Sequence, residues 1–151
     1  MTPSRFLKGF LVSLVLFTLL DAVWHGGIMA GFYQQRLMLM NPGTAVALVS
    51  FSPFILFVEA INAAALTYFV LHRQSADPDL SDAAWVGAFL GFTMSGTVNF
   101  LNHALIPEWD IVMAWVDTTW GTIAGCIAGI AVAALCGEHR RRGIFRLFSR
   151  K

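Results

Sequence analysis

The chain has 151 residues, of which 57% are hydrophobic and 13% are charged, with a formal net charge of +1 and a mean hydropathy of +0.67. This composition excludes an ordinary soluble domain and indicates a single domain whose solvent is lipid. No Gly-rich phosphate loop, nucleophile motif, zinc-ligand spacing or nucleic-acid module is present, which argues against familiar soluble chemistry and against a nucleic-acid partner.

Four apolar stretches follow one another along the chain, each long enough to cross a bilayer. They cover residues 9–30, 46–71, 83–106 and 111–135. The sequence therefore predicts an all-α fold, a four-transmembrane-helix bundle within residues 1–136. Within it, we expect Pro53 to kink the second span and Ser81 to cap the third.

The distribution of charge predicts how the bundle sits in the membrane. Basic residues gather at both termini, most of them in the tail at 137–151, whereas the turn between the third and fourth spans carries Glu108 and Asp110. The positive-inside rule then places both termini in the cytoplasm, in agreement with an even number of spans. We expect the tail to be a basic cytoplasmic segment that contacts anionic headgroups.

The strongly polar residues of the four spans are predicted to lie near one depth, in the outer half of the bilayer. No Lys or Arg lies within any span to neutralise the acids. An uncompensated carboxylate in hydrocarbon costs roughly 2.5 to 3.5 kcal/mol even on insertion scales, so these side chains must face one another, water or a ligand. The predicted ligand-pocket residues are Asp21, Trp24, His25, Glu59, Asn62, Asn99, Asn102, His103, Asp117 and Trp120.

Small residues recur every four positions on the third and fourth spans and predict close helix packing. They are Gly87, Gly91, Ser95, Gly121, Gly125 and Gly129. Aromatic residues near the predicted span ends indicate an anchoring belt at the headgroups. They are Tyr33, Tyr68, Trp85, Trp109 and Trp115.

Several short motifs resemble one bacterial family, the domain of unknown function 2177. They are Leu20-Asp21-Ala22-Val23-Trp24, the pair Phe32-Tyr33, Asn102 seven positions before Trp109, and Val116-Asp117-Thr118-Thr119-Trp120-Gly121-Thr122. The resemblance implies a small four-helix protein of the bacterial inner membrane with no assigned reaction. The chain departs from the family pattern at Val98-Asn99, where a Tyr-Asp pair is typical, and at His25 and His103, where apolar residues are usual.

His25 and His103 are the sharpest chemical candidates, because imidazole moves protons near neutral pH and ligates metals. Both are expected at comparable depth, so haem or a metal held through this pair is conceivable. We nevertheless predict no cofactor, because neither histidine lies in a recognised cofactor motif. A purely structural hydrogen-bonded network of the same acids and amides also stays open.

The sequence most favours a multi-pass inner-membrane protein whose polar pocket binds a lipid-derived or other small ligand, or docks a partner membrane protein. The interpretation leans away from catalysis, and no catalytic residue is named. The main alternative is a membrane enzyme that acts on an acyl chain or headgroup. A haem-binding or metal-binding protein and a proton-coupled transport subunit are less favoured, and a four-span carrier would need to form a homo-oligomer.

Overall fold

The computed structural model describes residues 1–40, 52–73 and 79–137, and within them it contains helices and no strand. Four helices are long and apolar enough to cross a membrane, as the hydropathy pattern predicts. They are Pro3–Ile28, Pro53–Arg73, Leu80–Leu105 and Ile111–Cys136. The prediction of an all-α bundle with four membrane spans is thus confirmed.

The first membrane helix is longer than predicted, and a further helix follows it before the second span begins. Helix α1 (Pro3–Val23) begins after Thr2, whose hydroxyl accepts a hydrogen bond from a backbone amide of the first turn. It continues as a π-helical turn, η1 (Trp24–Ile28), in which the wider winding is closed by a 2.8 Å hydrogen bond from Met29 N to Trp24 O. A further helix, α2 (Ala30–Met40), then occupies the predicted loop.

The role predicted for Pro53 is wrong. Helix α4 (Pro53–Arg73) begins at this proline instead of bending around it. Proline is favoured at the first helical position for two reasons. The backbone N–H of any residue there lacks an intrahelical partner, so its absence costs nothing, and the φ of proline is already helical. Residues 46–51 of the predicted second span lie outside the described residues.

The last two helices form an antiparallel hairpin with an acidic cap on each. The cap of α5 (Leu80–Leu105) is Asp79, whose carboxylate accepts from the backbone N–H groups of Ser81 and Asp82. The prediction of Ser81 as the cap is therefore wrong, since the aspartate two positions earlier already fills that role. Helix α6 (Ile111–Cys136) is capped in the same way by Asp110.

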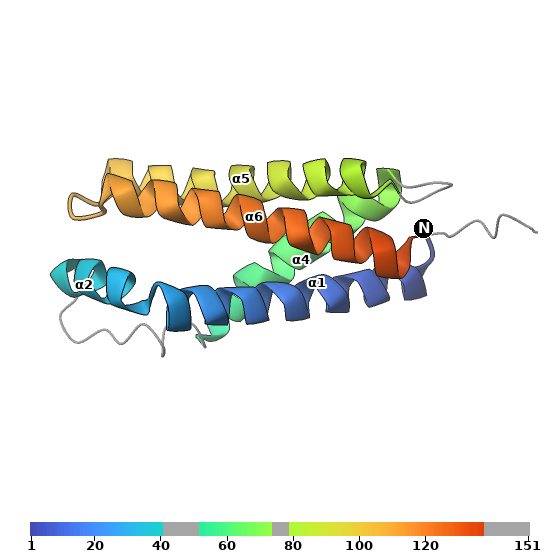
Figure 1. The fold of residues 1–151 in the computed structure, drawn as a ribbon, viewed down its shortest axis with the longest axis horizontal. Helices are drawn as coiled ribbons and strands as arrows, with labels where there is room; N and C mark the ends of the chain where they lie inside the picture. Colours follow the sequence, from blue (N-terminus) through green and yellow to red (C-terminus); the bar gives the residue numbers. More distant parts are fainter. Residues whose placement is uncertain (41–51, 74–78, 138–151) are drawn as a thin grey trace, which may run out of the picture.

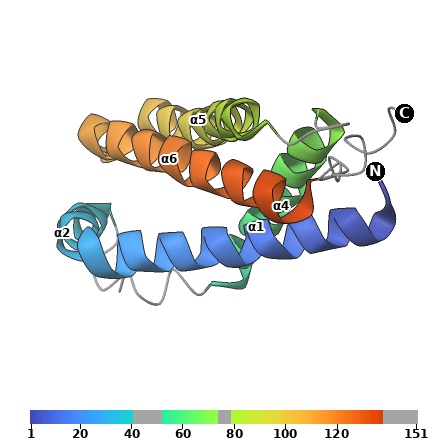
Figure 2. The same ribbon diagram turned by 45° about the vertical axis from the view of Figure 1, so that its right-hand side comes forward.

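The helices pack as two pairs (Figures 1 and 2). Helices α5 and α6 lie side by side over most of their length and make the most extensive interhelical contact. Helix α1 packs against α4 and α6, and α4 crosses obliquely behind the other helices in Figure 1. The contact of α4 with α5 is the least extensive among these packed pairs.

Basic side chains tie the start of α1 to the end of α6. Arg5 Nε donates to Cys136 O at 2.6 Å, and Lys8 Nζ donates to Leu135 O at 2.8 Å. Cations are favourable at a helix C-terminus, where backbone carbonyls lack intrahelical partners. Both contacts place the start of α1 and the end of α6 at the same end of the molecule, as the predicted topology requires. Which side of the membrane they occupy stays a prediction, and residues 138–151 of the basic tail lie outside the described residues.

Apolar side chains cover the outside of the bundle, as expected for a protein in lipid. Trp85 and Trp115 are 74% and 55% exposed, consistent with the predicted aromatic belt. Tyr33 is only 3% exposed, however, so its prediction as an interfacial anchor is wrong. Its hydroxyl donates a hydrogen bond to the carboxylate of Asp117 inside the bundle, as described below.

The predicted stripes of small residues face each other between α5 and α6. A Cβ atom on Gly87 would overlap the carbonyl group of Gly125, and one on Gly91 would overlap that of Gly121. The two backbones are therefore in direct contact, in the manner of small-xxx-small membrane packing.

We expect Gly87→Ala to destabilise the protein and Gly96→Ala to be tolerated. A methyl group at Gly87 collides with backbone that cannot rotate away, which costs roughly 1–3 kcal/mol. At Gly96 the nearest atom to an added Cβ is the Thr118 methyl at 3.4 Å, an ordinary contact, and alanine is the better helix former. Thermal unfolding of the two variants in the same detergent, followed by circular dichroism, gives the comparison. Equal midpoints would contradict the close seam.

Candidate functional site

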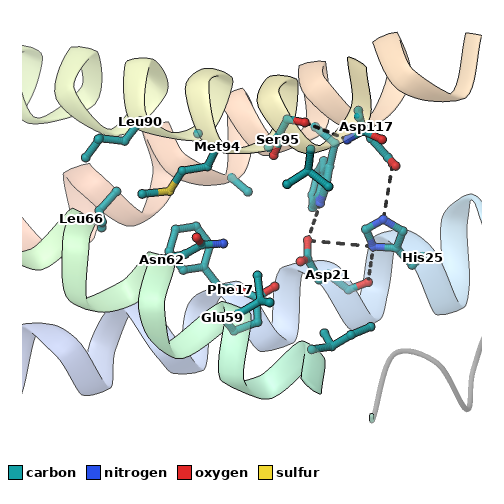
Figure 3. Close-up of a pocket in the computed structure, with 18 residues that line it drawn as sticks. Phe17, Asp21, His25, Glu59, Asn62, Leu66, Leu90, Met94, Ser95 and Asp117 are labelled. Atoms are coloured by element: carbon teal, nitrogen blue, oxygen red, sulfur yellow. Dashed lines mark hydrogen bonds and ion pairs between the residues drawn. The ribbon is translucent and has the colours of Figure 1, made fainter. Parts of the chain in front are cut away.

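A cavity of about 330 Å³ lies between the two helix pairs, and α1, η1, α4, α5 and α6 all contribute to its lining. Figure 3 shows the side chains that surround it. Seven of the ten residues predicted from the sequence line this cavity: Asp21, His25, Glu59, Asn62, Asn99, Asp117 and Trp120. The remaining three, Trp24, Asn102 and His103, are not among its lining residues.

His25 lies between two carboxyl groups on different helices (Figure 3). Its Nε2 atom is 3.5 Å from Asp117 Oδ1, and its Nδ1 atom is 4.0 Å from Asp21 Oδ1 and 3.2 Å from the Asp21 carbonyl oxygen. No Lys or Arg is among the described residues that line the cavity. The imidazole is consequently the one lining side chain that can bring positive charge to these acids.

Asp21 is held by the fourth helix and faces a second acid on α4. Trp120 Nε1 donates a 2.6 Å hydrogen bond to Asp21 Oδ1. The carboxyl group of Glu59, which is 7% exposed, lies close enough to Asp21 for the two groups to interact electrostatically. Two carboxylates that approach each other at this depth repel, because like charges interact strongly where water is scarce.

Tyr33 joins this network, although the sequence pattern places it among the anchors. Its hydroxyl donates to Asp117 Oδ1 and accepts a 3.1 Å hydrogen bond from Trp24 Nε1. The Trp24 ring in turn stacks on the ring of Trp120, with centroids 4.4 Å apart and planes 2° from parallel. Trp24 thus supports the cavity wall from behind. One feature of the sequence indicated a role for Tyr33 beyond anchoring: the pair Phe32-Tyr33 is among the motifs that resemble the family.

Helix α2 is positioned over the bundle end by an ion pair. Arg36 Nε donates to Asp110 Oδ2 at 2.5 Å, and the guanidinium carbon lies 3.7 Å from the centroid of the Phe32 ring. This hydrogen bond from Arg36, assisted by the backbone N–H of Val112, holds the pKa of Asp110 below its ordinary value. The pair fixes α2 to the start of α6 and so holds Tyr33 against Asp117.

The cavity also contains amide groups with unused hydrogen-bonding capacity. Asn99 is 6% exposed and donates from Nδ2 to Ser95 O at 3.0 Å, but its buried Oδ1 has no hydrogen-bond partner among the described residues. The carboxamide of Asn62 points into the cavity from α4. A buried acceptor without a partner is unusual in a native structure and indicates that something else satisfies it.

His103 and Asn102 lie beyond the end of the cavity. His103 is exposed, and its Nδ1 atom is 2.7 Å from the carbonyl oxygen of Trp109 in the turn between α5 and α6. The structure therefore does not bring His25 and His103 to one site. A ligand held between them would require both imidazoles to leave their present hydrogen-bonding positions. In the described ranges, no three His, Cys, Asp or Glu side chains are grouped to hold a metal ion.

The comparisons with known proteins agree with the architecture. A family described as Predicted membrane protein (DUF2177) matches residues 6–134, which contain the second and third spans, nearly all of the first and fourth, and every residue of the cavity. The chain belongs to this family. Neither the curated proteins nor the solved structures that were compared with it gave a match. This family member is therefore a membrane protein with four candidate spans, and the family carries no assigned activity.

We expect the contact between α2 and α6 to weaken in acid. Because the folded-state pKa of Asp110 lies below its unfolded value, the ion pair stabilises the protein fully above the ordinary aspartate pKa of about 3.9 and is lost as the pH falls through the lower, folded value. Asp110→Asn keeps a capping side chain but removes the charge. Wild type should lose more thermal stability than this variant between neutral pH and about pH 3, and parallel losses would contradict the assignment.

Proposed function

We propose that this protein binds a lipid-derived or other small amphiphilic ligand in the cavity, within the outer half of the bacterial inner membrane. The observation that carries the proposal is a 330 Å³ cavity lined by three carboxyl groups and by Asn99, whose buried Oδ1 atom has no hydrogen-bond partner among the described residues. Binding of a ligand with a hydrogen-bond donor would satisfy that atom and fill the space beside it.

A purely structural network accounts less well for this arrangement. An unsatisfied buried acceptor costs about 1–3 kcal/mol, and a cavity forfeits the packing contacts of the side chains around it. A network selected only for helix register would satisfy its own acceptors, as Ser13 does when its hydroxyl contacts Thr67 at 3.0 Å and Ala63 O at 3.2 Å between α1 and α4. In the cavity, in contrast, Asn99 Oδ1 has no hydrogen-bond partner among the described residues.

An enzyme that acts on a lipid headgroup or acyl chain is the second candidate. The observation that favours it is the placement of His25, whose Nε2 lies beside Asp117 at the cavity wall, an arrangement that suits a general base oriented by an acid. The binding proposal is preferred because Ser95 is the one hydroxyl side chain among the described lining residues, and its hydroxyl lies against Gly121. A further proposal is that the protein docks a partner membrane protein or a second copy of this chain. The variants of Asn62 and Asn102 described next would also test it.

Asn62→Leu should reduce the ligand that co-purifies with the protein, whereas Asn102→Leu should not. Both changes replace one amide by an apolar residue on a membrane helix, but only Asn62 lines the cavity. We expect about a tenfold loss of bound ligand for Asn62→Leu, the effect of one lost hydrogen bond of roughly 1.4 kcal/mol. Native mass spectrometry of protein from its own membrane measures the bound fraction. Equal loss in both variants, or no bound species in wild type, would contradict the proposal.

The two histidines offer a matched pair that separates ligand binding from a haem or metal function. His25→Gln should lower ligand retention, because it removes the imidazole between Asp21 and Asp117, whereas His103→Gln should leave retention unchanged. Under the binding proposal, protein from the native host has no Soret absorption. A stoichiometric haem spectrum that either single substitution alters would overturn the proposal in favour of axial ligation.

A further inference from the structure

The lining of the cavity changes from polar to apolar along the axis of the bundle. Asp21 of α1 and His25 of η1 lie beyond Phe17 in the direction of the α5–α6 turn. On α4, which runs the opposite way, Glu59 lies nearer that turn than Leu66. Figure 3 shows Leu66 with Leu90 and Met94 of α5 at the apolar end. If the α5–α6 turn is outside, this order matches that of a lipid in the outer leaflet, whose polar group faces outward.

The cavity opens sideways between α4 and α5. Val58 of α4 and Val98 of α5 both line it, yet they are 49% and 55% exposed, so these two side chains form its rim. The contact between these two helices is also much less extensive than that between α5 and α6. Both rim residues are apolar and lie on membrane helices, so the opening faces the hydrocarbon region of the bilayer.

The charges around the cavity select against an acidic ligand. Asp21, Glu59 and Asp117 line it, the described lining residues include no Lys or Arg, and the one lining imidazole, His25, already lies between Asp21 and Asp117. Placing another anion among these acids is unfavourable, because like charges interact strongly where water is scarce. The free acceptor Oδ1 of Asn99 requires a donor instead. The polar end therefore suits hydroxyl or amino groups.

The size of the cavity limits how much of a ligand it encloses. At about 30 Å³ for each water-sized group, a volume of 330 Å³ holds roughly eleven such groups. A complete two-chain lipid is several times larger. An occupant with a long chain must therefore leave part of that chain in the opening between α4 and α5.

We propose that the cavity binds the hydroxyl-bearing or amino-bearing end of a single-chain amphiphile that enters from the bilayer between α4 and α5, and that it rejects anionic headgroups. The inference rests on the proposed binding function and adds to it the ligand class and the route of entry. Asn99 Oδ1 and the carboxyl groups accept hydrogen bonds from the headgroup, while Leu66, Leu90 and Met94 surround the first part of the chain.

The test uses the full chain in phosphatidylcholine nanodiscs with three probes of equal chain length: 1-dodecanol, dodecylamine and dodecanoate. Native mass spectrometry measures the bound fraction of each at neutral pH. We expect dodecanol and dodecylamine to bind at least about tenfold more tightly than dodecanoate, and Asn99→Leu to weaken dodecanol binding by about tenfold. Glu59→Gln combined with Asp117→Asn should raise the affinity for dodecanoate.

The route of entry is tested with one pair of tryptophan variants. Val98→Trp places a large ring at the rim, whereas Val15→Trp places it on α1 at a residue with the same 55% exposure that does not line the cavity. Binding of dodecanol should slow at least several-fold only in Val98→Trp. Equal rates in the two variants would overturn entry between α4 and α5.

The outcomes of the probe experiment separate the two proposals. If dodecanoate binds as tightly as dodecanol and Asn99→Leu weakens both, the cavity is a ligand site but its preference for donor headgroups is wrong. If no probe binds to wild type above the level seen with Asn99→Leu, both the ligand class and the proposed binding function are wrong.

Discussion

The structure depends on how three carboxyl groups are accommodated at bilayer depth without a Lys or Arg in the spans. Asp21, Glu59 and Asp117 would each be strongly unfavourable against lipid, and all three face the interior of the bundle. Trp120 and Tyr33 donate hydrogen bonds to two of them, and His25 lies between the same two. The π-helical turn η1 carries Trp24 and His25, which contact this network, and such turns are often found at functional sites.

The difference in packing between the helix pairs creates the space that the acids surround. Glycines allow the backbones of α5 and α6 to touch, so this pair forms a closely packed unit. Helix α4 crosses obliquely and touches α5 much less, which leaves room beside Glu59 and Asn62. The cavity is therefore bounded on one side by the close α5–α6 seam and on the other by α4, which packs mainly on α1 and α6. Such an arrangement suits a site that a ligand enters from the bilayer.

The sequence predicts the spans and most of the cavity because one physical signal dominates each. Hydropathy determines where a helix crosses the membrane, and the free energy of burying an acid determines that Asp21, Glu59 and Asp117 face inward. Local details depend on competition between neighbours that hydropathy does not report. Pro53 begins a helix because its fixed φ suits the first turn. Asp79 is the cap because its carboxylate accepts hydrogen bonds from the backbone N–H groups of Ser81 and Asp82.

The rotation and reach of individual side chains are harder to predict from spacing alone. Asn102 and His103 lie about one turn beyond Asn99 on α5, which is enough to carry them past the end of the cavity to the turn at Trp109. Tyr33 reaches Asp117 only because an unpredicted helix, α2, brings it back over the bundle. Such placements are determined by tertiary contacts such as Arg36 with Asp110.

An experimental structure of the protein in discs of its native membrane, resolved well enough to show side-chain amides, tests the central claim most directly. The account predicts density for a ligand in the cavity, with a polar group within hydrogen-bonding distance of Asn99 Oδ1 and a chain that leaves between α4 and α5. A structure in which α4 packs tightly against α5, fills the cavity with side chains and satisfies Asn99 Oδ1 from within the protein would contradict it.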